Sequence, residues 1–189
     1  MRYIMAQALI FLATGYEEVE MLTVVDLLRR SKISIDMVSV TGSLEVTSSH
    51  NVTIKADKLF EQADFEEAKM IILPGGIPGT PNLLAYQPLT DKIKEFASQK
   101  KWLSAVCAAP TVYDELGLFQ GRKATCYPSF ADKLKDASYV KQPVVVDDIF
   151  ITSRGAGTTI EFAAAIVERF AGKAAADEVL KAIIYQDTY

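Results

Sequence analysis

The stretch KWLSAVCAAPT, residues 101–111, joins a strand pattern directly to a helix pattern. Residues 102–106 form an apolar run, which predicts a short buried strand. Ala108, Ala109 and Pro110 then open a predicted helix. Cys107 therefore lies at a strand-to-helix turn. We expect its thiol at the carboxyl edge of a sheet, where open α/β sheets bind ligands.

Two interpretations of Cys107 follow from this position. The unpaired N–H groups and partial positive charge of a helix start favour a thiolate over a thiol. The placement is similar to the nucleophile elbow of hydrolases, with sulfur in place of oxygen. A free cysteine is, however, commonly a buried small hydrophobic side chain. On this stretch alone, Cys107 is a candidate nucleophile that needs a partner.

Strand and helix patterns alternate on both sides of this stretch. Buried strands are predicted at residues 8–13, 34–40 and 69–73, and helices at 19–30, 88–100, 159–171 and 174–184. Residues 44–47 and 52–56 predict a small β excursion, 124–127 a short strand, 128–134 a helix, and 144–146 with 149–153 a hairpin. This alternation predicts a single α/β domain over residues 1–189. We expect a flavodoxin-like (Rossmann-like) fold, with a largely parallel sheet sandwiched by helices.

Composition restricts the class of protein. Half of the 189 residues are hydrophobic and 23% are charged, which are ordinary globular values. The net charge of -4 predicts no nucleic-acid partner and no polybasic membrane anchor. Two cysteines do not make a disulfide framework, which indicates a reducing compartment. The apolar start, residues 1–13, is too short to span a bilayer and is not a convincing signal peptide. We expect a soluble, cytoplasmic protein.

Glu20 is the candidate partner of Cys107. It lies one turn inside the helix that follows the first strand, and its neighbours Val19 and Met21 are apolar. A carboxyl group in partly apolar surroundings has a raised pKa and can share a proton with an adjacent thiolate. The alternative is structural, because Glu17, Glu18 and Glu20 would each complement the dipole at a helix start.

The turn after residue 73 is rich in glycine. Gly75 and Gly76 allow the backbone to approach a ligand, and successive N–H groups can form an oxyanion hole or anion nest. A tight turn at the end of a strand is the simpler alternative. No dinucleotide fingerprint or P-loop is present, so no nucleotide cofactor is predicted. Two cysteines and one histidine, scattered along the chain, do not predict a metal site.

Four motifs together resemble the DJ-1/ThiJ/PfpI superfamily. They are GYEEVE at residues 15–20, LPGG at 73–76, AVCAAP at 105–110 and TSRGAGT at 152–158. The resemblance covers nearly the whole chain, and it implies a flavodoxin-like fold, no cofactor and a homodimer. It also implies that Cys107 is a peroxide-oxidisable nucleophile and that Glu20 is its protonated partner. By the same resemblance, the amides of Gly75, Gly76 and Ala108 would bound an anion pocket.

The activities ascribed to this superfamily include deglycation, glyoxalase-type conversion of methylglyoxal to lactate, stress sensing and chaperone action. We therefore expect a cysteine-dependent stress-response protein that acts on reactive carbonyls or on glycated substrates. The alternative is a non-catalytic redox sensor or chaperone that works through oxidation of Cys107. A cysteine peptidase and a ThiJ protein with a thiamine-biosynthesis label are less favoured alternatives.

One departure from the superfamily pattern concerns residue 127. Close relatives have a histidine before the proline where this chain has Tyr127, a phenol that is a poor base at neutral pH. Tyr127 is thus at most an auxiliary residue, and a Cys-His-acid triad is disfavoured. Cys126 is expected to be a core thiol that points away from Cys107. His50 is expected at the surface or at an interface.

Overall fold

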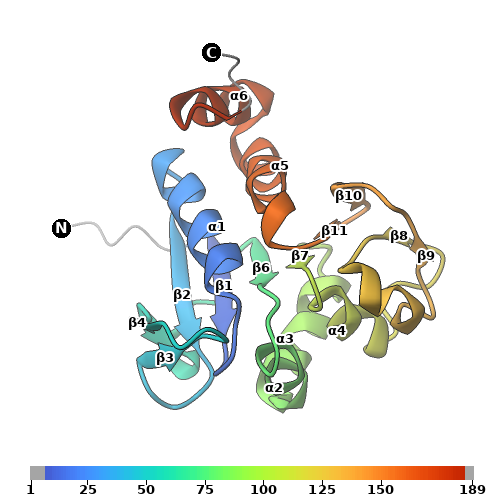
Figure 1. Ribbon diagram of the computed structural model, residues 1–189. Helices are drawn as coiled ribbons and strands as arrows, with labels where there is room; N and C mark the ends of the chain where they lie inside the picture. The colour runs from blue at the N-terminus through green and yellow to red at the C-terminus, as the bar shows by residue number, and fades with distance from the viewer. Residues whose placement is uncertain (1–6, 186–189) are drawn as a thin grey trace.

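A seven-stranded sheet forms the centre of the protein (Figure 1). The structure is a computed structural model that describes residues 7–185; residues 1–6 and 186–189 of the expected domain lie outside the described residues. The sheet contains β1 (Ala8–Leu12), β2 (Ile35–Ser39), β5 (Lys58–Leu59), β6 (Met70–Leu73), β7 (Trp102–Val106), β10 (Val144–Asp147) and β11 (Phe150–Ser153). Its order is β10-β11-β7-β6-β1-β2-β5, and every neighbouring pair is parallel except β10 and β11, which form an antiparallel hairpin.

The strand order identifies the fold class. Counted along the chain, the five central parallel strands β1, β2, β6, β7 and β11 are arranged 2-1-3-4-5 in space. This is the flavodoxin-like order of a doubly wound sheet. The predicted α/β fold is confirmed.

Helices cover both faces of the sheet. One face carries α1 (Glu18–Arg30), α5 (Thr159–Ala171) and α6 (Lys173–Ala182), and the other carries α2 (Gly79–Ala85), α3 (Gln87–Ser98) and α4 (Pro110–Glu115). Alternate residues of β1 face opposite layers: Ile10 packs in the cluster that includes α1 and α5, and Phe11 in the cluster that includes α3 and α4. Because both faces are covered, the central strands are apolar at nearly every position.

The topology brings three turns to one edge of the sheet. β1, β6 and β7 are adjacent and parallel, so their carboxyl ends point the same way. The turn before α1, the glycine-rich turn after β6 and the Cys107 turn after β7 therefore meet there. Such an edge is the usual ligand-binding position of this fold.

The structure differs from the sequence prediction in several places, and the short strand β5 is one that was not predicted. Helix α2, which follows the glycine-rich turn, was not predicted, because its seven residues are too few to show a helical period. The predicted strand at 124–127 is reduced to β8 (Lys123–Ala124), which pairs with β9 (Ser138–Tyr139) outside the main sheet. The Thr125 amide donates to the side chain of Thr152 instead of a neighbouring strand. The predicted helix at 128–134 is a 3-10 helix, η2 (Pro128–Lys133).

The β excursion is confirmed as an antiparallel hairpin of β3 (Glu45–Thr47) and β4 (Thr53–Lys55). Figure 1 shows it close to the N-terminal end of α1. Among the described helices, none has the length and apolar character needed to cross a bilayer.

Candidate functional site

Cys107 occupies a strained turn between β7 and α4. Its φ of 63° lies in the left-handed region, which is costly for a residue other than glycine and recurs at functional sites. Two backbone hydrogen bonds hold the turn: the Cys107 amide donates to the Ser153 carbonyl over 3.1 Å, and the Tyr127 amide donates to the Cys107 carbonyl over 2.8 Å. The predicted position at a strand-to-helix turn is confirmed.

Glu20 lies directly beside this turn. Its side chain projects from the first turn of α1 and is 1% exposed. The Gly75 amide donates to Glu20 Oε2 over 2.7 Å, and a side-chain hydrogen bond joins Glu20 to Cys107. The fold thus brings together the two residues that the sequence singled out.

Backbone amides surround the sulfur as well. The Gly76 and Ala108 amides hydrogen-bond to Cys107 and act to lower its pKa. The Gly75 amide serves Glu20 and does not donate into the pocket, which differs from the role expected of it. The reason is steric, because Gly75 lies between the pair: a Cβ there would be 2.6 Å from Cys107 Cβ and 2.8 Å from Glu20 Oε2.

Burial controls the ionisation of the pair. It raises the pKa of Glu20 to about 7, against the hydrogen bonds from Gly75 and Cys107. Burial, followed by the charge of Glu20 and the hydrogen bond to it, raises the pKa of Cys107 to about 12. The expected preference of a helix start for a thiolate is therefore outweighed while Glu20 is ionised. Two such strongly interacting groups titrate as one unit, which carries a single negative charge between pH about 7 and about 12.

The sulfur is partly exposed, in a pocket of about 370 Å³. The pocket is lined by Glu17, Ser49, His50, Gly76, Ile77, Cys107, Ala108, Tyr127 and Phe130. Its volume suits a small molecule. Glu20 is not among the residues that line the pocket and is shielded from bulk water. It is connected to the pocket through its hydrogen bond with Cys107. Ile77 and Phe130 were not singled out from the sequence, because Ile77 lies in an irregular turn and Phe130 in the short 3-10 helix η2.

The two residues before Pro128 have separate environments. Tyr127 lines the pocket, as its auxiliary role requires, and its ring lies against Gly155, where a Cβ would be 3.4 Å from Tyr127 Cδ2. Cys126 is fully buried, and its Sγ donates to the Tyr127 carbonyl over 3.4 Å. Burial raises the pKa of Cys126 to about 11. The prediction that Cys126 is a core thiol is confirmed.

His50 is exposed, as expected, but it also lines the pocket, which sequence reasoning missed. The β3–β4 turn carries it to the start of α1, where Nδ1 lies 3.1 Å from Glu18 Oε1 and 3.5 Å from Glu17 Oε2. Ligand atoms of these three residues lie within 4.8 Å of one another, a proximity that sequence spacing could not reveal. The ion pairs account for this arrangement without a metal, so the expectation of no metal stays a prediction.

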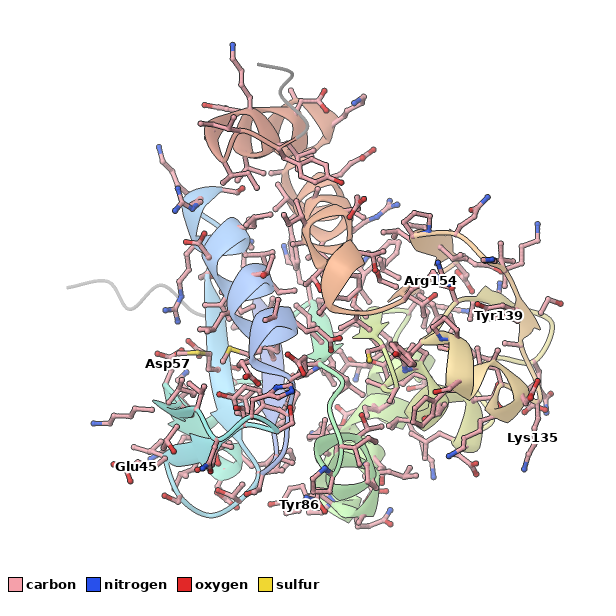
Figure 2. The ribbon with its side chains drawn as sticks, in the orientation of Figure 1. Glu45, Asp57, Tyr86, Lys135, Tyr139 and Arg154 are labelled. Carbon is pink, nitrogen blue, oxygen red and sulfur yellow. The ribbon has the colours of Figure 1, made fainter. Side chains whose placement is uncertain are left out.

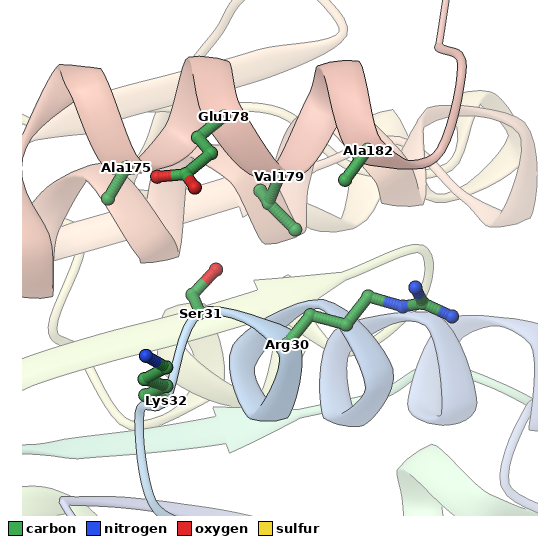
Figure 3. A pocket seen from close by; sticks show the side chains of 7 residues that line it. All are labelled: Arg30, Ser31, Lys32, Ala175, Glu178, Val179 and Ala182. Carbon is green, nitrogen blue, oxygen red and sulfur yellow. The ribbon is translucent and has the colours of Figure 1, made fainter.

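A second hollow lies far from the thiol in the fold. Figure 3 shows it between the end of α1 and helix α6, with a volume of about 360 Å³. It is lined by Arg30, Ser31, Lys32, Ala175, Glu178, Val179 and Ala182. These residues include no cysteine or histidine, so the hollow lacks the thiol and imidazole found in the Cys107 pocket.

Comparison with known proteins agrees with this geometry. Protein DJ-1 homolog B of Arabidopsis thaliana is 38% identical over 94% of this chain, which spans 41% of the length of that relative. The solved structure of oxidized Toxoplasma gondii DJ-1 superposes with a TM-score of 0.92 at 32% identity, covering 96% of this chain and 99% of that one. A protein of Schizosaccharomyces pombe named glutathione-independent glyoxalase DJ-1 is 29% identical over 95% of this chain and 98% of its own.

The match extends to a family definition. Residues 6–169 match the sequence model of the DJ-1/PfpI family, and this range contains the Cys107 turn, Glu20 and the glycine-rich turn. The chain therefore belongs to the DJ-1/PfpI family.

Proposed function

We propose that this protein is a cysteine-dependent enzyme of carbonyl stress, which acts on methylglyoxal or on the hemithioacetals and aminocarbinols that such carbonyls form. The observation that carries the proposal is the hydrogen-bonded pair of Cys107 and Glu20 at the base of a small-molecule pocket. A nucleophile beside a group that accepts its proton is the minimal arrangement for covalent catalysis.

The pair supports an internal redox conversion of methylglyoxal. Glu20 takes the thiol proton, and the Cys107 thiolate adds to the aldehyde carbon to form a hemithioacetal. A proton then moves from C1 to C2 through an enediolate, which gives a lactate thioester. Water hydrolyses the thioester and restores the thiol. The reaction consumes one water, and no external oxidant is needed because C1 is oxidised as C2 is reduced.

The amides of Gly76 and Ala108 have a defined role in this sequence. They already donate toward the sulfur, and addition of the thiolate to a carbonyl creates an oxyanion next to that sulfur. Donors that are fixed before the reaction stabilise such a charge without reorganisation. The Schizosaccharomyces pombe relative, whose name describes a glutathione-independent glyoxalase, is consistent with this chemistry.

Methylglyoxal consumption and lactate formation test the proposal. Wild type is compared with Cys107→Ala and Glu20→Gln, and Cys126→Ala serves as the matched control because it removes a thiol outside the pocket. We expect turnover in wild type and the control, and loss of turnover in the other two. Equal rates in all four proteins would refute the catalytic role.

A redox-sensor function is the second candidate. The same two amides would stabilise a sulfinate on Cys107, formed when two equivalents of peroxide oxidise the thiolate and release two molecules of water. Intact-mass measurement after mild peroxide treatment separates the functions. A gain of two oxygens at Cys107, without methylglyoxal turnover, would favour the sensor. A peptidase is less supported, since no hydrogen bond joins His50 to Cys107 in the described part of the chain.

We also propose that the protein is a cytoplasmic homodimer. Val19 and Leu22 on α1 and Val52 beside β4 are large apolar side chains with substantial exposure. The ion pair between Glu18 and His50 links α1 to the turn between β3 and β4, so these side chains belong to connected elements. A second copy of the chain would cover this surface.

A further inference from the structure

His50 reaches the Cys107 pocket from an element distant in sequence. It belongs to the turn between β3 and β4, and it lines the pocket together with Cys107 and Tyr127. Its side chain is 68% exposed, whereas those of Glu17 and Glu18 are 15% and 14% exposed. The imidazole of His50 thus contacts two largely buried carboxylates, while most of its own surface is exposed to the pocket and solvent.

The contacts of His50 all fall on one ring nitrogen. Nδ1 lies 3.1 Å from Glu18 Oε1, 3.5 Å from Glu17 Oε2 and 3.2 Å from Ser49 Oγ. The carboxylates make Nδ1 the nitrogen that carries the proton, because they can only accept. In neutral imidazole Nε2 is then the basic atom. Among the described residues, Nε2 has no hydrogen-bond partner.

The contact between His50 and Glu18 is similar to that of a catalytic histidine whose ring is oriented by a carboxylate. A carboxylate that holds one imidazole nitrogen fixes the tautomer and stabilises the imidazolium formed when the other nitrogen takes a proton. Here Glu18 is the closest acceptor, and Glu17 is itself held by the hydroxyl of Ser49, which donates to it over 3.3 Å. Nε2 is therefore available to a reaction partner in the pocket that His50 lines.

The proposed reaction contains a step for which the pair of Cys107 and Glu20 is poorly suited. A proton must leave C1 of the hemithioacetal and another must arrive at C2. Glu20 is 1% exposed and engaged with Gly75 and Cys107. Tyr127 carries a phenol, which is a poor base at neutral pH. His50 is the imidazole that this pocket offers.

We propose that His50 is the base of the carbon-to-carbon proton transfer, with Nε2 as the reacting atom and Glu18 as the residue that positions it. This inference rests on the proposed carbonyl activity. Nε2 takes the C1 hydrogen as a proton, and its electron pair forms the enediolate double bond. The imidazolium then returns a proton to C2, and the hydroxyl proton on O1 passes to O2, which generates the lactate thioester. After this step His50 is neutral again, and the product has the same number of protons as the hemithioacetal.

The charged surroundings give the step a pH dependence. The hydrogen bond and charge of Glu18, followed by the charge of Glu17, raise the pKa of His50. The titratable groups around the pocket are Glu17 and Glu18 from α1, Cys107 with Glu20 behind it, and Tyr127. A base acts in its neutral form, so the rate gains a limb that rises with pH as His50 loses its proton.

The test compares wild type, His50→Gln, Glu18→Gln and Cys107→Ala in methylglyoxal turnover across pH, with iodoacetamide alkylation of Cys107 as a second readout. Glu45→Gln is the matched control, because Glu45 is an exposed acid of the same hairpin that does not line the pocket (Figure 2). We expect His50→Gln to lower kcat on the order of 100-fold. Alkylation of Cys107 should stay at the wild-type rate. Glu18→Gln should shift the histidine limb to lower pH.

The outcomes separate the two proposals. Turnover that depends on Cys107 but is unchanged in His50→Gln would overturn this inference and leave the proposed function intact. Absence of turnover in wild type would overturn both. A chelator that abolishes the His50-dependent rate would make the imidazole a metal ligand, and would also overturn the inference. A lost pH limb with normal alkylation would support it, because a structural defect would lower both readouts.

Discussion

Glu20 and Cys107 are hydrogen-bonded to each other, and only Glu20 is sealed from solvent. The carboxyl group can therefore hold a proton without exchanging it readily with water, while the sulfur faces the pocket. The difference in exposure suits the two groups to different roles. In the proposed reaction, Cys107 would attack the substrate as a thiolate while Glu20 holds the proton that the thiol gives up.

Alkylation of Cys107 should respond to the ionisation of the pair. Because Glu20 loses its proton at pH about 7 and can then accept the proton of the Cys107 thiol, the rate with iodoacetamide should rise through that pH. An isolated cysteine thiol would instead respond near its ordinary pKa of 9.0. The measurement uses a Cys126→Ala background, so that Cys107 is the only thiol. A single rise near pH 9.0 would contradict the shared charge.

The stability of the fold should fall as Glu20 ionises. Its pKa is raised from 4.5 to about 7 by burial, so the fold favours the protonated form. The resulting stabilisation is complete below pH 4.5 and is lost as pH rises through about 7. Relative to Glu20→Gln, wild type should lose on the order of 3 kcal/mol of unfolding free energy across this window. Urea denaturation at several pH values measures it, with Glu45→Gln as control, and parallel curves for wild type and Glu20→Gln would contradict it.

A side chain at Gly75 should separate the catalytic pair. The added Cβ of Gly75→Ala would lie 2.6 Å from Cys107 Cβ and 2.8 Å from Glu20 Oε2, so one of the two must move. Displacement of a reacting group by about 1 Å commonly costs on the order of 100-fold in rate. Gly157→Ala is the control, since its Cβ would meet nothing within 4 Å. Wild-type methylglyoxal turnover in Gly75→Ala would show that the spacing of the pair is not critical.

The surface of α1 should hold two copies of the chain together. Leu22 is 45% exposed on α1, and Leu22→Arg would place a charge in the proposed interface. Light scattering should give twice 20.8 kDa for wild type and 20.8 kDa for the variant. Val146→Arg, at a 47% exposed valine on the edge strand β10, should leave the mass unchanged. A monomeric wild type would refute the dimer, and a dimeric Leu22→Arg would place its interface elsewhere.

The core of the fold was predictable because buried strands and helices have recognisable patterns of apolar residues in the sequence. Strands β1, β6 and β7 are covered on both faces, so β1 and β6 are uninterrupted apolar runs and β7 is apolar except at Ser104. Helix α2 and strand β5 are too short for such a pattern. The prediction of a strand at 124–127 was wrong for another reason. The backbone of this segment bonds with a side chain and with the Cys107 turn, and such pairings over long sequence separations are not encoded locally.

The candidate site was predictable where it follows from topology. Glu20 follows β1 and Cys107 follows β7, two parallel strands that lie on either side of β6. The turns at their carboxyl ends therefore lie close together. His50 lies on a hairpin outside the sheet, so no strand order leads to it. The hydrogen bond from the Gly75 amide to Glu20 could not be predicted either, because it depends on the close packing of the two residues in the folded protein.

Difference infrared spectroscopy of wild type against Glu20→Gln tests the central claim most directly. The measurement is made where the pair carries one charge, between pH about 7 and about 12. We expect the carboxylate band of Glu20 in wild type, missing from Glu20→Gln, together with a neutral Cys107 thiol, because the pKa of Glu20 is about 7 and that of Cys107 about 12. The carbonyl band of a protonated carboxylic acid together with thiolate absorbance at the same pH would contradict this claim.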